Sequence, residues 1–123
     1  MLLTSKTKKR KTFNAFPNKA AMNTAKDYIK NRVNGYFQTE SSDFCVRKLF
    51  GGSNGDWQGT PLQVLYDYYY QKYKSQNRPD CHEKAIKQAA KDVGALLIVV
   101  LDEAPESFVC TGYRNQTNWY NKK

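Results

Sequence analysis

The sequence predicts one small α+β domain. Three stretches carry apolar residues at helical spacing, and short apolar runs bounded by turn residues lie between and after them. The chain has 123 residues, of which 40% are hydrophobic, enough for one core and too few for two large lobes. We therefore expect about three helices packed on a short antiparallel sheet over residues 13–123, preceded by a disordered basic arm over residues 1–12.

The first predicted helix begins at Asn18, because asparagine is a good N-cap residue. Gly35 is a natural C-terminal stop, so we expect the helix to end there. Its apolar side recurs at helical spacing and consists of Ala21, Met22, Ala25, Tyr28, Ile29 and Val33.

Residues 36–40 and 44–50 are predicted to form two strands, since turn residues lie between them at 41–43. The glycine-rich segment 51–59 follows. It lacks the Gly-Lys-Ser/Thr of a Walker A loop and the dinucleotide fingerprint. Trp57 in this segment is either an exposed anchor or a buried side chain that pins the turn.

The second helix is predicted from Thr60, the N-cap, with Pro61 at the first helical position and Gln63 completing a capping box. Tyr68 and Tyr70 point away from the predicted buried stripe, so they are candidates for exposed contacts. Tyrosine suits such contacts because it combines stacking area with a polar tip. The predicted stripe consists of Leu62, Leu65, Tyr66, Tyr69 and Tyr73.

The third helix is predicted from Asp80, with Glu83 completing a second capping box. Gly94 interrupts its apolar pattern. Either the helix runs on to about Leu101, or it ends at Gly94 and residues 95–101 form a buried strand. We favour the continuous helix.

The C-terminal segment begins with an acidic turn, which is followed by a strand predicted over residues 108–113. The tail over residues 114–123 is polar. It contains Trp119 and Tyr120, which either dock on the body or stay exposed for a partner.

The net charge of +9 is distributed unevenly. Residues 1–35 hold nine basic residues and one acid, and the rest of the chain is close to neutral. Such asymmetry indicates a polyanionic partner, namely nucleic acid, a ribonucleoprotein or an anionic membrane, unless the lysines serve solubility alone. The candidate phosphate contacts are Lys6, Lys8, Lys9, Arg10 and Lys11 in the arm and Lys19, Lys26, Lys30 and Arg32 in the first helix.

No catalytic or metal-binding pattern is present in the sequence. The three cysteines are widely spaced, and the single histidine, His82, is beside Cys81 on a helix, where adjacent residues do not face each other. A metal-dependent nuclease needs convergent carboxylates, and Asp43, Asp56 and Asp67 have no motif spacing. We therefore expect a non-enzymatic protein without a cofactor, with a small nuclease as an alternative.

No stretch approaches the roughly 18 apolar residues of a membrane span. The longest apolar run is residues 95–101. The N-terminus lacks the apolar stretch and cleavage site of a secretory signal. We therefore expect a cytoplasmic protein with no membrane role.

Two segments of the chain carry a resemblance to a known family. They are FNAFPNKAAMNTAKDYIKNRVNGYF, which follows the lysine-rich arm, and DFCVRKLFGGSNGDWQGTPLQVLYDYYYQKY. Together they resemble small accessory proteins of phages and mobile elements in Gram-positive bacteria, and among these the type II-A anti-CRISPR proteins that inhibit Cas9. The resemblance covers about residues 12–100 and transfers no catalytic residues.

The resemblance implies an inhibitor that works in the cytoplasm of a bacterial host. Many anti-CRISPR proteins are acidic mimics of DNA, and the positive charge of this chain excludes that mechanism. A basic inhibitor would instead engage guide RNA, the nucleic acid held by Cas9, or an acidic Cas9 surface.

We therefore expect a non-enzymatic protein that inhibits a Cas9–guide RNA nucleoprotein. The alternative is a protein-interaction or homodimer module, in which the tyrosine-rich helix and the tail aromatics form the interface. The candidate partner contacts are Trp57, Tyr68, Tyr70 and Trp119.

Overall fold

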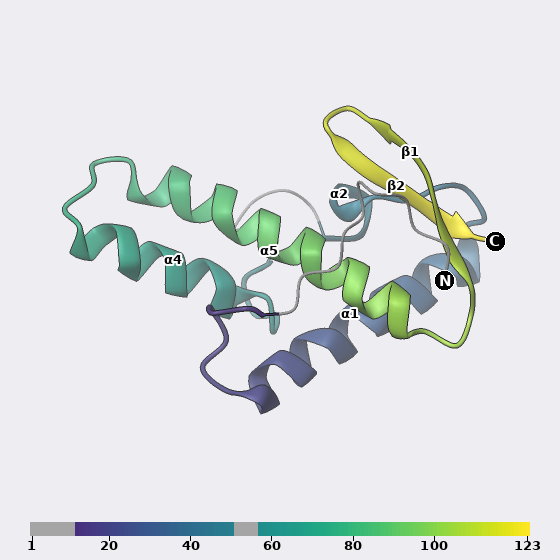
Figure 1. The fold of residues 1–123 in the computed structure, drawn as a ribbon, viewed down its shortest axis with the longest axis horizontal. Coiled ribbons are helices and arrows are strands. Elements are labelled where there is room, and N and C mark those ends of the chain that lie inside the picture. Colours follow the sequence, from purple (N-terminus) through teal and green to yellow (C-terminus); the bar gives the residue numbers. More distant parts are fainter. Residues whose placement is uncertain (1–11, 51–56) are drawn as a thin grey trace.

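The computed structural model describes residues 12–50 and 57–123. The predictions for the arm residues 1–11 and for the loop residues 51–56 lie outside this part of the chain. The α+β class is confirmed, because the described helices pack together and carry a two-stranded antiparallel sheet (Figure 1). In chain order the elements are α1 (Lys19–Thr39), α2 (Val46–Phe50), α4 (Gln63–Ser75), α5 (Cys81–Glu103), β1 (Phe108–Arg114) and β2 (Thr117–Lys122).

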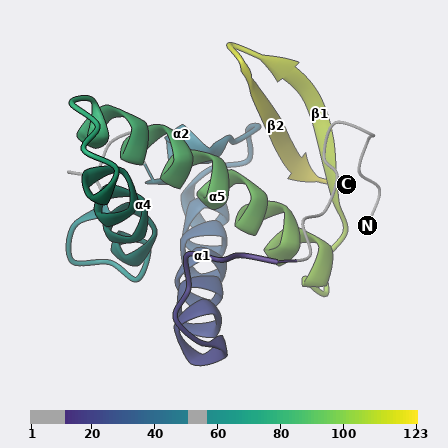
Figure 2. The same cartoon turned by 60° about the vertical axis from the view of Figure 1, so that its left-hand side comes forward.

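Helix α5 is the central element of the fold. It runs without interruption through Gly94 to Glu103, which confirms the continuous helix. Residues 96–101 are all buried, so this part of α5 is apolar on every side, as expected for a helix inside a core. α4 lies antiparallel along its first half, α1 crosses its second half, and the β-hairpin stands at the end of the molecule away from α4 (Figures 1 and 2).

Helix α1 begins as predicted but ends later. The Asn18 side chain accepts a hydrogen bond from the Ala21 backbone N–H at 2.8 Å, which confirms the N-cap. The predicted stop at Gly35 and the strand over residues 36–40 are wrong, because the helix continues to Thr39. A glycine inside a helix costs only about 1 kcal/mol relative to alanine. The packing of the last turn of α1 against the rest of the fold offsets that cost.

Residues 44–50 do not form the predicted strand. Phe44 makes an isolated bridge, in which its N–H and C=O each hydrogen-bond Tyr120 at 2.8 Å. The chain then turns into the short helix α2, whose Leu49 and Phe50 are buried. Short apolar runs fit either a strand or a buried helical turn, and here the helical turn covers α1. The Arg32 guanidinium donates to the Leu49 carbonyl and so ties the end of α2 to α1.

The two predicted capping boxes do not form, although both helices lie where they were expected. The Thr60 hydroxyl accepts a backbone N–H two residues later, but α4 begins only at Gln63. The Gln63 amide donates to Asp67 at 3.0 Å instead of reaching back to Thr60. Asp80 precedes α5 without a capping hydrogen bond, and its carboxylate pairs with Arg78 at 3.3 Å.

The C-terminal segment forms a β-hairpin. The strand predicted over residues 108–113 is confirmed as β1, whereas β2 was not predicted from the polar tail. Arg114 pairs with Thr117 next to the turn, and a bulge lies between Cys110 and Gly112. The turn residues 115 and 116 have φ values of 54° and 63°, as a tight two-residue hairpin turn requires.

An aromatic cluster fastens the hairpin to α1. Phe44 is at its centre and has no exposed surface. Its ring lies 5.5 to 6.4 Å from the rings around it, in the tilted and edge-on arrangements that aromatic pairs prefer. These surrounding rings belong to Tyr36, Phe37, Phe108 and Tyr120.

Candidate nucleic-acid interface

The four aromatic partner contacts predicted from the sequence lie in different environments. Trp57 is 1% exposed, so the structure places it in the core and corrects its assignment as an exposed anchor. Tyr68 is 37% exposed. Tyr70 is half-buried and stacks on Tyr66 at 5.6 Å. Trp119 is docked on the hairpin, where its indole N–H donates to a backbone carbonyl at 3.1 Å.

The four basic residues predicted on α1 do not share one face. At about 100° per residue, Lys19, Lys26 and Lys30 lie on one flank of the buried stripe and Arg32 lies on the opposite flank. Lys26 forms an ion pair of 2.6 Å with Glu103, and Arg32 is bonded to the end of α2. Lys19 and Lys30 are exposed. Two of the four cations are therefore engaged within the fold.

A second group of cations lies on α5. Lys84, Lys87 and Lys91 are spaced by three and four residues, so they form one row along the helix, which we call the α5 basic row. Lys87 and Lys91 are exposed. Asp80 and Glu83 line a pocket of about 200 Å³ together with Lys84 and Lys87, so acids partly offset the charge of the row at its N-terminal end.

Helix α2 carries two cations that line different grooves. Lys48 lines a groove of about 300 Å³ between α1 and α2. Its ammonium lies 5.9 Å from the ring of Tyr36 and 5.8 Å from that of Trp119. Arg47 lines a larger groove on the other side of α2, together with Lys91.

This larger cavity, which we call the α5–hairpin groove, has a volume of about 420 Å³. Among the described residues that line it there are two cations and no acids. Tyr113 is 54% exposed and lines its hairpin wall. The complete lining is Val46, Arg47, Ala90, Lys91, Gly94, Tyr113, Gln116, Thr117 and Asn118.

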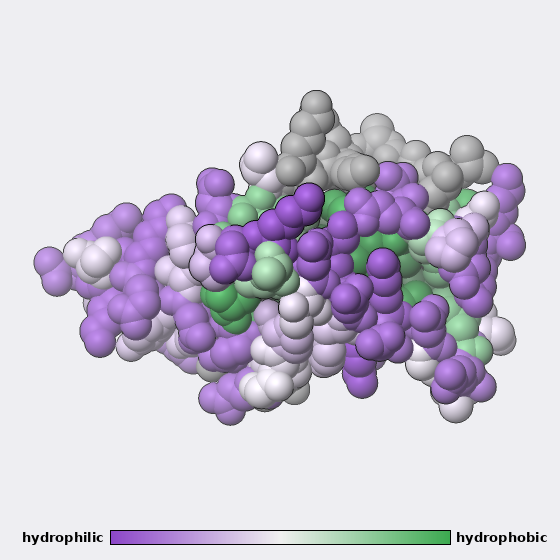
Figure 3. All heavy atoms as spheres, turned by 90° about the horizontal axis from the view of Figure 1, so that it is seen from below, coloured by the Kyte–Doolittle hydropathy of each residue, from purple (hydrophilic) through white to green (hydrophobic). Residues whose placement is uncertain are grey.

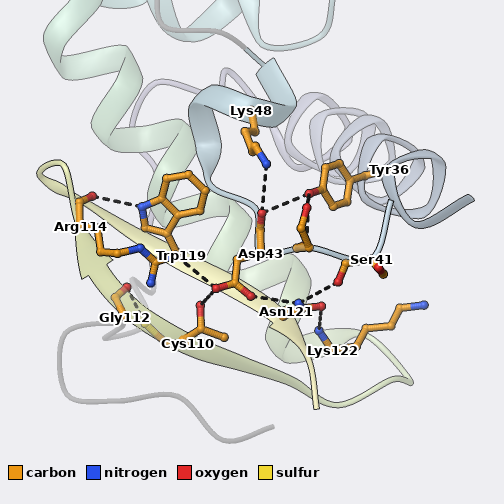
Figure 4. A network of polar contacts seen from close by, with 12 residues as sticks. Tyr36, Ser41, Asp43, Lys48, Cys110, Gly112, Arg114, Trp119, Asn121 and Lys122 are labelled. Carbon is orange, nitrogen blue, oxygen red and sulfur yellow. Dashed lines mark hydrogen bonds and ion pairs between the residues drawn. The ribbon is translucent and has the colours of Figure 1, made fainter. Parts of the chain in front are cut away.

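A polar network around Asp43 holds the hairpin in place beside the groove. One carboxylate oxygen accepts hydrogen bonds from Thr111 at 2.8 Å and Arg114 at 3.2 Å, and the other accepts from Asn121 at 3.0 Å. Figure 4 shows Asp43 between the side chains of the hairpin and those of Tyr36 and Lys48, whose hydroxyl and ammonium donate to its carbonyl. The hydrogen bonds from Asn121 and Thr111, followed by that from Arg114, lower the pKa of Asp43.

Asp43→Asn is expected to destabilise the protein by about 1–2 kcal/mol at pH 7, because Thr111 and Arg114 lose a charged acceptor. The folded pKa is lowered, so the carboxylate stabilises the fold above its unfolded pKa of about 4 and loses this effect as the pH falls through the folded value. Urea unfolding at pH 7 and at pH 3 measures both effects.

The matched control for this change is Glu40→Gln, at an exposed acid near the end of α1. This variant is expected to unfold within about 0.5 kcal/mol of the parent. An Asp43→Asn protein as stable as the control at pH 7 would contradict the anchoring role of the network.

The carboxylates considered for nuclease chemistry belong to separate networks. Asp43 is held by the hairpin, Asp67 accepts from Gln63, and Asp56 lies outside the described residues. Within residues 12–50 and 57–123, no group of three or more His, Cys, Asp or Glu side chains is placed to hold a metal ion. The three cysteines are free thiols.

His82 takes part in an aromatic contact on the α4–α5 pair. Its Nδ1 lies 2.7 Å from the Tyr66 hydroxyl, and the two rings meet edge-on at 5.7 Å. The pKa of Tyr66 is raised, first by burial and then by its neighbours Tyr70, Cys81 and Asp67. The contact therefore joins the two helices and gives His82 a structural partner.

Sequence reasoning missed the α5–hairpin groove. Lys87 and Lys91 are spaced in the sequence as neighbours on one helix face. However, the acids that follow them bring the net charge of residues 81–123 close to zero. Tyr113 and Arg47 are far apart in the sequence and meet at the groove through the fold.

No helix in the described part of the chain is long and apolar enough to cross a membrane. No protein-family model, curated protein or solved structure matches the chain.

Proposed function

We propose that this chain is a non-enzymatic protein that binds nucleic acid in a nucleoprotein, with guide-RNA-loaded Cas9 as the target that it inhibits. The observation that carries the proposal is the group of cations Arg47, Lys87 and Lys91, which we call the α2–α5 basic surface: Arg47 and Lys91 line one groove, and Lys87 lies one turn along α5 from Lys91. Among the described residues, ion pairs engage three other basic side chains, Lys26, Arg78 and Arg114.

The chemistry of this surface suits a phosphate backbone. Lysine and arginine neutralise phosphates and release condensed counterions, which supplies most of the affinity of sequence-independent binding. The arm residues 1–12 bring five further cations on the same chain. Figure 3 shows the molecule from below the view of Figure 1, where hydrophilic side chains cover most of the end at which α4 and α5 meet. Phosphate contacts position a nucleic acid without reading its sequence.

The target within this proposal comes from the resemblance to type II-A anti-CRISPR proteins. Guide RNA bound to Cas9 offers the polyanion that the basic surface requires. A protein that occupies it would block assembly of the nucleoprotein or its engagement of DNA, with no catalytic residue of its own.

The homodimer alternative has less support. A stable interface buries about 800 Å² on each partner and is centred on aromatic side chains. Among the described residues, the exposed large hydrophobic side chains are Tyr68 on α4 and Tyr113 on β1. Two tyrosines on different elements do not form one apolar patch, so we do not advance this function.

The salt dependence of RNA binding tests the proposal. If about five phosphates of a single strand are neutralised, the affinity is expected to fall about a hundredfold between 50 and 200 mM salt. Fluorescence anisotropy with a labelled single-stranded RNA measures the effect. An affinity that does not change with salt, or a failure to bind RNA in low salt, would overturn the proposal.

A further inference from the structure

We propose that the α5–hairpin groove is a binding site for one unstacked nucleotide of a single strand. The inference rests on the proposed function, because it names the part of a nucleic acid that the α2–α5 basic surface holds. Its volume of about 420 Å³ lies within the range of about 300–1,000 Å³ that is usual for small-ligand pockets.

The walls of the groove supply each kind of contact that a nucleotide makes. Tyr113 offers an exposed ring for stacking, and base–aromatic stacking is the main sequence-tolerant contact to single strands. Arg47 and Lys91 supply the positive charge for a phosphate. Gln116 and Asn118 carry amides that can pair with the edge of a base.

The hairpin wall is held in position by the rest of the fold. Arg47 donates to the carbonyl of Asn115 at the hairpin turn at 3.4 Å, which leaves its other N–H groups to face a ligand. Tyr113 and Asn118 are cross-strand partners, so both side chains lie on one face of the hairpin. The hydrogen bonds from Thr111 and Arg114 to Asp43 fix the strand that carries Tyr113. A site with fixed walls loses less entropy when it binds.

Gly94 lines the groove, and the space beside its Cα is open enough to hold a Cβ. A Cβ built there would have Val46 Cγ2 as its nearest neighbour at 3.8 Å, an ordinary van der Waals contact. Alanine would therefore fit, and it is the better residue inside a helix. Glycine at this position in the middle of α5 therefore leaves space in the groove that a larger side chain would occupy.

A single strand fits this groove better than a duplex does. The bases of a duplex are stacked and paired, so none of them can turn towards Tyr113 without the cost of unpairing. The α5 basic row lies outside the groove except for Lys91, and it offers phosphate contacts to single and double strands alike. The groove is therefore expected to discriminate between single strands and duplexes, whereas the α5 basic row is not.

The test measures the binding of a labelled oligouridine RNA, the matching oligodeoxythymidine and a duplex RNA by anisotropy in low salt. Two variants change the lining of the groove, namely Tyr113→Ser, which removes the aromatic ring, and Gly94→Leu, which adds a large side chain. Each has a matched control: Tyr68→Ser at an exposed tyrosine of α4, and Gly94→Ala, which adds only the Cβ. Thermal unfolding verifies that all four variants are folded.

We expect Tyr113→Ser and Gly94→Leu to weaken binding of the single strands roughly tenfold or more, while duplex binding and both controls stay within about twofold of the parent. Equal losses for single strand and duplex, or no loss for either, would overturn the groove site and leave the proposed function standing. A parent protein that binds none of the three probes would overturn the proposed function, and the groove site with it.

Discussion

Phe44→Ala is expected to lower the free energy of unfolding by about 3–5 kcal/mol. The Phe44 ring is fully buried between the last turn of α1 and the hairpin. Its removal leaves a cavity at the place where these elements share an aromatic cluster, and cavities in a packed core are only partly relieved by relaxation. Urea unfolding followed by circular dichroism measures the change.

The control for this prediction is Tyr68→Ala, which removes an aromatic ring that is 37% exposed and lies on α4. It is expected to cost less than about 1 kcal/mol. If Phe44→Ala unfolds within about 1 kcal/mol of the parent, the hairpin is not packed against α1 as described, and the wall of the α5–hairpin groove loses its support.

The double variant Lys87→Gln, Lys91→Gln is expected to bind RNA roughly thirtyfold more weakly in low salt, because each of the two phosphate contacts contributes about 1 kcal/mol. The slope of log K against log salt is expected to shrink in magnitude by about 1.4, since each contact to a single strand contributes about 0.7. Both lysines are exposed on one face of α5, so the fold is expected to remain intact. Anisotropy titrations at several salt concentrations provide both quantities.

The same charge change at Lys72 and Lys74, which are exposed in the last turn of α4, is the matched control. It is expected to change the affinity by less than about threefold, because these lysines lie outside the α2–α5 basic surface. Equal effects of the two double variants would show that RNA responds to the total charge of the protein, and the assignment of the interface to α2 and α5 would then fail.

The helix positions could be predicted from the sequence where cap residues and periodicity agree. Asn18 starts α1 with the hydrogen bond that its residue type favours. α5 continues through Gly94 because its apolar spacing persists on both sides, and burial of residues 96–101 outweighs the cost of one glycine.

The region over residues 36–50 could not be predicted, because its structure depends on distant parts of the chain. Phe37 extends α1 beyond Gly35 by packing on Phe108, which is far away in the sequence. β2 has a polar sequence with no alternating pattern, and it is held by Tyr120, which is buried against Phe44. Tertiary packing of this kind leaves no local signal in the sequence.

The candidate site could be predicted only in part. The charge asymmetry directed attention to the first third of the chain, but the structure pairs Lys26 with Glu103 and uses Arg32 to hold α2. The charge of the last third is close to zero, although three of its five lysines lie on the first half of α5 and two of its five acids, Asp102 and Glu103, lie at the end of that helix. This distribution of lysines and acids along α5 becomes evident only in the fold.

The most direct test of the central claim is a binding titration against guide-RNA-loaded Cas9, apo Cas9, guide RNA, an unrelated RNA and duplex DNA. It is run at about 50 and about 200 mM salt, with gels to detect cleavage. We expect tight, salt-sensitive binding to the loaded complex and to RNA, without cleavage. Salt-insensitive binding to apo Cas9 alone would contradict the role of the basic surface. Binding to none of these targets would contradict both the nucleic-acid partner and its Cas9 target.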